Sequence, residues 1–255
     1  MSGGMEFVGE SVRLLPTIFS LNSIGSKKVF MGLECTTLSE KKYIPIMSLL
    51  DLTLTGIGFN ISQWSQLKEQ RTKINSYSYG FDPNSRDKKI QGDKWTLKFT
   101  YSRHENALEF AEERQDVSSK TVIDFDHSSF HLHTDLFERL MEISQYIDHR
   151  FEYLTKTATL LPIVVETIVA HLFYRFLPMI DFRIKFRKDI VKMALNELEN
   201  DDRFFDRLVK NVELRSNGSE SNIGICKTEM KTFFYEIVIT RTDGIVQMLN
   251  TRLGD

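Results

Sequence analysis

The sequence predicts an α+β fold in which two tandem ββββα units form a pseudo-dimer of curved antiparallel sheets, followed by an α-rich C-terminal region. Three observations carry this prediction: a strand-cap-helix pattern at residues 57–74, its recurrence at 130–147, and helical periodicity after residue 157. We place the first unit at residues 1–82, the second at 83–156 and a mostly helical extension at 157–255.

The first strand-helix junction has the local chemistry of a capped helix. Ile57 and Phe59 alternate as in a strand, Asn60 is placed to cap a helix, and Gln63 stands in capping-box register. Apolar residues then recur at helical spacing, at Trp64, Leu67 and Ile74. One face of this helix can therefore close over a sheet.

The same pattern of apolar positions recurs later in the chain with different residues. A shift of 73 residues, without a gap, places an apolar residue on each apolar residue of the first junction. The pairs are Ile57 with Phe130, Phe59 with Leu132, Trp64 with Phe137, Leu67 with Leu140 and Ile74 with Ile147. Such a fixed period indicates an internal repeat, with chance correspondence at two strand-helix junctions as the alternative.

The segment QWSQLKEQ, residues 63–70, resembles the signature of the positive cofactor four family of transcriptional coactivators. The resemblance implies a ββββα unit that binds single-stranded DNA, with Trp64 at the DNA-binding side of the junction. Two such units on one chain would be similar to the PUR-repeat and Whirly families of single-stranded nucleic-acid binders. The chain departs from the coactivators in lacking their basic, serine-rich tail and in carrying about 100 further residues.

The remaining elements follow from alternation and turn residues. We expect strands at residues 12–20, 28–36, 41–48 and 49–59 in the first unit, and a helix at 61–75. Residues 76–93 are the expected linker, or else a basic loop that tracks phosphates through Arg86, Lys88 and Lys89. The second unit has expected strands at 94–101, 107–113, 121–126 and 129–133 and a helix at 134–154.

The C-terminal region is expected to hold helices at residues 162–177, 188–198 and 203–212, and a strand at 232–240 with a turn at 242–244. The first of these is apolar all round, and Pro162 is placed at its first turn. Glu166, His171 and Arg175 interrupt it, which disfavours a membrane span and favours a buried or interface helix. We expect homo-oligomers through these helices and no membrane association.

Composition indicates an ordinary globular protein, with 41% hydrophobic and 27% charged residues and a formal net charge of −2. Lys and Arg outnumber Asp and Glu by 14 to 9 in residues 1–104, but number 5 against 12 in residues 105–156. The first repeat is therefore the better candidate for binding a polyanion. Two cysteines and no visible secretory signal indicate a reducing, intracellular and, for a DNA-binding protein, nuclear location.

A single-strand-binding surface needs cations for phosphates and aromatic rings for bases. On the second expected strand, Lys28, Phe30 and Glu34 share one face, opposite Val29 and Met31. The candidate nucleic-acid-binding residues are Arg13, Lys27, Lys28, Phe30, Lys41, Lys42, Tyr43, Trp64, Lys94, Trp95 and Lys98. Trp64 and Trp95 have an alternative role as core residues, and Lys41 and Lys42 as a solvated turn.

The predicted function is largely sequence-independent binding of single-stranded DNA, or of RNA, in transcription or DNA replication; a viral protein is compatible with so divergent a chain. One alternative is an interaction protein that keeps the fold without the nucleic-acid surface. Another is a metal-dependent nuclease, because His131 and His133 point the same way on a strand near Asp124, Asp126, His127 and Asp135. The sequence contains none of the common phosphate-loop, dinucleotide, hydrolase-elbow or zinc-protease motifs. We therefore expect a binding protein without enzymatic activity, metal or cofactor.

Overall fold

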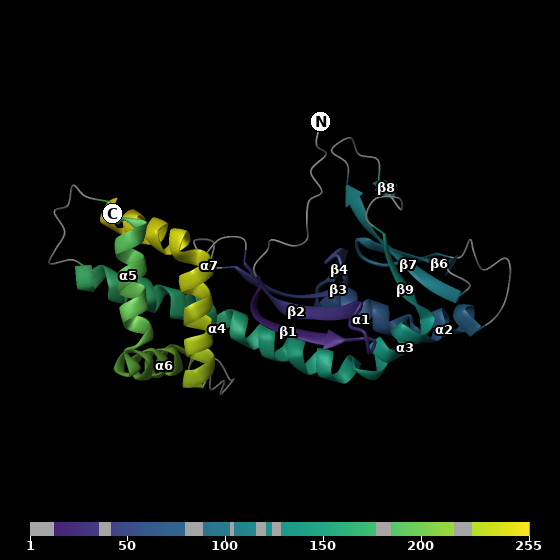
Figure 1. The fold of residues 1–255 in the computed structure, drawn as a ribbon, viewed down its shortest axis with the longest axis horizontal. Helices are drawn as coiled ribbons and strands as arrows, with labels where there is room; N and C mark the ends of the chain where they lie inside the picture. The colour runs from purple at the N-terminus through teal and green to yellow at the C-terminus, as the bar shows by residue number, and fades with distance from the viewer. Residues whose placement is uncertain are drawn as a thin grey trace. The chain divides into compact units, whose positions relative to one another are not determined.

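A computed structural model describes residues 13–35, 42–79, 89–102, 105–115, 121–123, 129–176, 185–216 and 226–254 (Figure 1). The strands are β1 (Leu14–Ser20), β2 (Lys27–Cys35), β3 (Tyr43–Asp51), β4 (Gly56–Phe59), β5 (Lys89–Gln91), β6 (Trp95–Ser102), β7 (Glu105–Gln115), β8 (Thr121–Ile123) and β9 (Phe130–His133). The helices are α1 (Ile61–Glu69), α2 (Arg71–Tyr79), α3 (Thr134–Glu142), α4 (Ser144–Phe176), α5 (Lys188–Glu199), α6 (Asp202–Ser216) and α7 (Lys227–Gly254). The α+β class with a helical C-terminal region is confirmed.

The strands form two sheets, one for each predicted unit. Sheet 1 has the order β1-β2-β3-β4, and sheet 2 has the order β5-β6-β7-β8 with β9 also paired to β7. The pairs β3–β4, β5–β6, β6–β7, β7–β8 and β7–β9 are antiparallel. The first strand of sheet 2, Lys89–Gln91, lies within the segment that we predicted to be a linker. This strand is three residues long, and an exposed-buried-exposed alternation of that length is too short to identify a strand from sequence.

The repeat is visible in the bounds of the elements. The shift of 73 residues carries α1 onto α3, Gln70 onto Ile143, and the start of α2 at Arg71 onto the start of α4 at Ser144. In both copies a one-residue break divides the helical segment, which we had predicted to be continuous. All ten residues of the five apolar pairs are at most 4% exposed. The equal length of α1 and α3, the equal break after them and the equal burial confirm two tandem ββββα units, the second of which carries one additional strand in its sheet.

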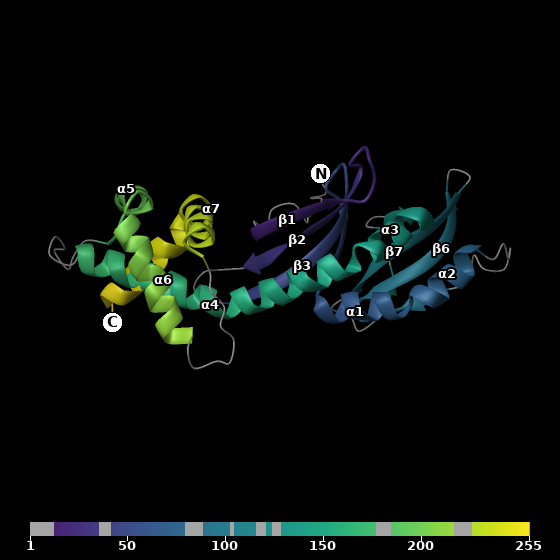
Figure 2. The same cartoon turned by 90° about the horizontal axis from the view of Figure 1, so that it is seen from below.

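Two compact units divide the chain. Unit 1 includes residues 16–32 and 45–151 and therefore contains most of both repeats, whereas unit 2 includes 11–15, 33–44 and 152–255. Aromatic side chains join the two repeats inside unit 1. The ring of Phe59 on β4 packs edge-on against Trp95 on β6, with centroids 6.3 Å apart. Tyr77 on α2 packs against Phe99 on β6 at 5.0 Å, so the helix of the first repeat covers the sheet of the second (Figure 2).

The C-terminal part of unit 2 is helical (Figure 1). The predicted strand at 232–240 and turn at 242–244 are wrong, because both lie inside α7. Phe234 of α7 packs against Phe204 and Phe205 of α6, with centroids 5.8 and 5.3 Å apart. Met230, Phe233 and Phe234 are buried at helical spacing, so packing overrides the β-propensity of TFFYEIVIT.

Helix α4 is continuous through Pro162, where we had predicted the start of a new helix. Among the described helices it alone is long and apolar enough to cross a membrane by length and composition, a criterion that buried core helices also meet. Its apolar residues Leu160, Leu161, Val164, Val165, Ile168, Val169 and Leu172 are all at most 3% exposed. They form part of the core of unit 2, as expected for a buried helix.

Candidate nucleic-acid interface

The outer face of sheet 1 is the candidate interface. On β2, Val29 and Met31 are fully buried, whereas Lys28 and Phe30, which alternate with them, are half-buried and point to the opposite side. This is the alternation that the sequence predicted. The backbone N–H of Leu21 donates to the carbonyl of Lys27 at 2.9 Å, and regular antiparallel pairing from that bond sets Ile18 opposite Phe30.

Strands β3 and β4 extend this face. Ser48 pairs with Gly58, while the core residues Met47 and Leu49 pair with Phe59 and Ile57. A Cβ atom on Gly58 would lie 3.6 Å from Oγ of Ser48 and 3.8 Å from Cγ2 of Ile46, so these three residues share the outer face. We call Ile18, Lys28, Phe30, Ile46, Ser48 and Gly58 the sheet 1 outer face. It combines one ring, one ammonium group and apolar surface; Ile18 is 59% exposed, whereas Ser48 is fully buried. Glu34 lies on the same side of β2 as Lys28 and Phe30, near the end of the strand, so this side of sheet 1 also carries a carboxylate.

Both tryptophans differ from the expectation that they would present stacking faces. Trp64 is 0% and Trp95 1% exposed, so neither indole can stack on a base. The Nε1–H of Trp64 donates to Oδ1 of Asp148 at 2.7 Å, and the Nζ of Lys68 lies 2.6 Å from Oδ2 of the same carboxylate. These residues belong to α1 of the first repeat and α4 of the second. Trp64 therefore joins the repeats instead of lying on the binding face.

Three further candidates are also turned inward. Arg13 is 8% and Tyr43 7% exposed, and burial lowers the pKa of the Arg13 guanidinium although Glu34 acts to raise it. Lys27 places its Nζ 4.2 Å from the centroid of the Phe130 ring, at the edge of the core of unit 1. These cations balance local carboxylates and rings, so they are poorly placed for phosphates.

Among the described residues, the remaining candidates lie at the start of β3 and on sheet 2. Lys42 is exposed just before β3, and Lys94 is exposed in the β5–β6 turn, where its φ is 62°. Lys98 is half-buried on the outer side of sheet 2. Lys41, Arg86 and Lys88 lie outside the described residues. Of the predicted residues that the structure describes, Lys28 and Phe30 share the sheet 1 outer face.

Sequence reasoning missed the apolar members of this face. Ile18 and Ile46 are spaced as ordinary strand residues, and nothing local shows which side of the sheet receives the helices. Gly58 offered the clearest signal, because a glycine at alternate register between Ile57 and Phe59 leaves the outer side of β4 without a side chain.

The metal hypothesis finds no support in the described part of the chain, where no three His, Cys, Asp or Glu residues converge as ligands. Asp124, Asp126 and His127 lie outside the described residues. His131 stands on the outer side of β9 with its Nε2 3.7 Å from Oε1 of Glu109. His133 occupies the cap position of α3 without a capping hydrogen bond, where Asn60 makes a full capping box in the first repeat.

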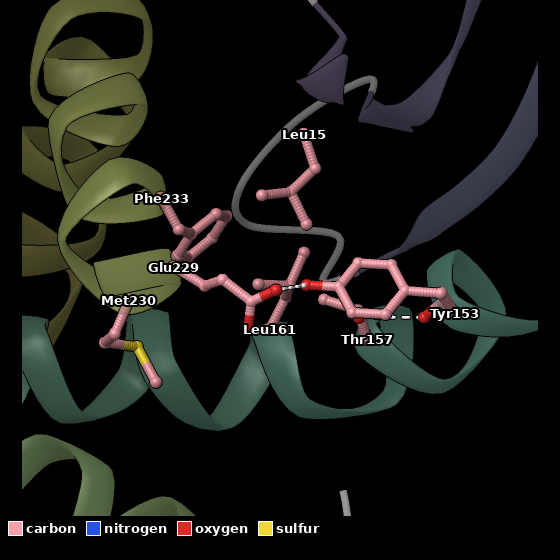
Figure 3. A pocket seen from close by; sticks show the side chains of 7 residues that line it. All are labelled: Leu15, Tyr153, Thr157, Leu161, Glu229, Met230 and Phe233. Atoms are coloured by element: carbon pink, nitrogen blue, oxygen red, sulfur yellow. Dashed lines mark hydrogen bonds between the residues drawn. The ribbon is translucent and has the colours of Figure 1, made fainter. Parts of the chain in front are cut away.

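A small cavity in unit 2 lies among Leu15, Tyr153, Thr157, Leu161, Glu229, Met230 and Phe233 (Figure 3). Across two of the helices that line it, the hydroxyl of Tyr153 donates to Oε1 of Glu229 at 2.7 Å. With a volume of about 10 Å³ it has room for about one water molecule, too little for a substrate.

Comparison of the sequence with protein families matches no family model, and comparison with curated proteins finds no match.

Proposed function

We propose that this chain binds single-stranded nucleic acid, DNA in the first instance, through the sheet 1 outer face. The observation that carries the proposal is that Lys28 and Phe30 lie together on the side of β2 that faces away from the core. The resemblance of residues 63–70 to the positive cofactor four signature and the duplicated ββββα unit support it. In this proposal the protein acts in transcription or DNA replication.

The chemistry of the face suits a flexible single strand. A base stacked on an aromatic ring contributes roughly 1–3 kcal/mol, and Phe30 with the neighbouring Ile18 offers such a surface. Lys28 supplies a cation two residues from the ring, about one nucleotide phosphate away along an extended strand. The face has few hydrogen-bonding groups that could read base edges, so binding should be largely independent of sequence.

The test is fluorescence anisotropy of a labelled oligo-dT at two salt concentrations, beside a duplex of equal length. We expect salt-weakened binding of the single strand and a loss of roughly 1–3 kcal/mol for Phe30→Ala. Lys28→Ala should weaken binding and flatten the salt dependence by about 0.7 in logarithmic slope, the value for one phosphate contact on a single strand.

Matched controls lie on helices of the same unit. Lys73 on α2 and Tyr146 on α4 are both exposed, so Lys73→Ala and Tyr146→Ala remove the same kinds of group away from the sheet. Both controls should bind oligo-dT as the unaltered protein does. Equal losses in the controls and in the sheet variants would contradict a binding site on sheet 1.

A protein-interaction role is the second candidate. The burial of both tryptophans and the 59% exposure of Ile18 favour it, since they leave a face with more aliphatic than aromatic surface. Absence of binding to oligo-dT and to oligo-U at low salt would favour this role over nucleic-acid binding.

A further inference from the structure

The two sheets present different outer faces, and the difference centres on Glu109. The strand registers place Lys89 opposite Lys98, Lys98 opposite Glu109, and Glu109 opposite His131. These four residues therefore form one row across β5, β6, β7 and β9. They lie on the side of sheet 2 opposite the buried residues Leu97, Phe110 and Phe130, which pair in the adjacent register.

The repeat identifies the counterpart of Glu109 in sheet 1. The shift of 73 residues carries Gly58 onto His131, and these residues pair with Ser48 and Glu109 respectively. Ser48 is thus the residue of sheet 1 that occupies the position of Glu109. A neutral serine in one copy is replaced by a carboxylate in the other.

The carboxylate changes what the second face can attract. Glu109 is 8% exposed in the middle strand of the row, flanked by Lys98 on one side and His131 on the other. A negative charge there offsets the attraction of Lys89 and Lys98 for phosphates, and a partly desolvated charge is weakly screened by salt. Among the described residues on this face, no phenylalanine, tyrosine or tryptophan provides a stacking surface like that of Phe30, so a strand on sheet 2 would be held by Lys89 and Lys98 through its phosphates.

We infer that Glu109 keeps nucleic acid off sheet 2, so that the pseudo-dimer binds one strand per chain, on sheet 1. This inference rests on the proposed function and extends it by assigning a specificity role to one residue. The two repeats then divide their tasks: the first supplies the binding face, and the second supplies Asp148 and the aromatic core that hold the first in place.

The experiment measures strands bound per chain, using oligo-dT of roughly 8 nucleotides, a length that fits one sheet. Protein is titrated into oligonucleotide far above the dissociation constant, and native mass spectrometry counts the strands. We expect one strand for the unaltered protein and two for Glu109→Ser, which copies sheet 1, and for Glu109→Gln, which keeps the side-chain shape. Glu69→Gln removes a charge from the exposed side of α1 and should keep one strand.

A combined variant locates the second strand. Phe30→Ala with Lys28→Ala should abolish binding in the unaltered background but leave one strand in the Glu109→Ser background, and Lys98→Ala should then remove it. Emission of the buried Trp64 and Trp95 reports whether unit 1 stays folded. Two strands on the unaltered protein, or one strand on both folded Glu109 variants, would overturn this inference while the proposed function stands. No binding by any of these proteins would overturn both.

Discussion

The two tryptophans differ in what their indole N–H groups contact. Trp64 donates to the Asp148 carboxylate, which also binds Lys68. The buried Nε1 of Trp95 has no hydrogen-bond acceptor among the described residues, and its ring packs against Gly92. A hydrogen bond to a charged group stabilises more than a neutral one, and this bond is part-buried. The Asp148 carboxylate would keep its contacts with Lys68 if the indole N–H were removed.

This difference predicts unequal costs for the same substitution. Trp64→Phe should lower the free energy of unfolding by about 1–3 kcal/mol more than Trp95→Phe does, because only the first removes a hydrogen bond to a carboxylate. Urea denaturation followed by the emission of the remaining tryptophan measures both, since each variant keeps one buried reporter in unit 1. Equal destabilisation would show that ring packing alone holds Trp64.

The close approach of the two strands in the β3–β4 hairpin requires a glycine at residue 56. Its turn is held by Asp51, whose carboxylate accepts hydrogen bonds from the hydroxyl groups of Thr53 and Thr55 at 2.7 and 2.8 Å. Burial raises the pKa of Asp51, but these hydrogen bonds outweigh it and the pKa is lowered. At Gly56 the strands approach so closely that a Cβ atom would lie 1.8 Å from the carbonyl oxygen of Leu49.

Gly56→Ala should therefore destabilise unit 1 by about 2–4 kcal/mol, because the clash is with backbone that can move only by opening the hairpin. Gly58→Ala is the matched control: its Cβ atom would meet Ser48 at 3.6 Å, an ordinary contact, so we expect a change within about 0.5 kcal/mol. Thermal unfolding of both variants, followed by tryptophan emission, tests the pair. Similar melting temperatures would show that β4 can shift to accept the methyl group.

At the scale of the whole molecule, the repeats depend on each other. The core of the first repeat is completed by the second, through Phe59 against Trp95 and Phe110 and through Trp64 to Asp148. The apolar side chains of α4 that we predicted to mediate oligomerisation are buried within unit 2. Self-association through the C-terminal helices stays a prediction, and it would need other surfaces of those helices.

A fragment of residues 1–82 should consequently lack a cooperative fold as a monomer, since it exposes Phe59 and Trp64 once their partners are removed. Its single tryptophan should emit as a solvent-exposed indole and show no sigmoidal urea transition. A monomeric fragment with a cooperative transition and shielded emission would contradict the dependence of the first repeat on the second. Size-exclusion chromatography with light scattering distinguishes a monomer from a dimer that replaces the missing repeat with a second copy.

The tandem repeat could be predicted from the sequence alone. The same positions are buried in both copies, so apolar residues recur there at the same spacing. The sequence also determined that Lys28 and Phe30 lie opposite Val29 and Met31, since side chains alternate along any strand. Only the tertiary structure decided that Trp64 and Trp95 face inward and that TFFYEIVIT is helical. The physical reason is the same for both. Residues distant in sequence pack against a strand or a helix, and this packing decides which side of a sheet is buried and whether a segment is helical or extended. The sequence of the segment itself does not contain that information.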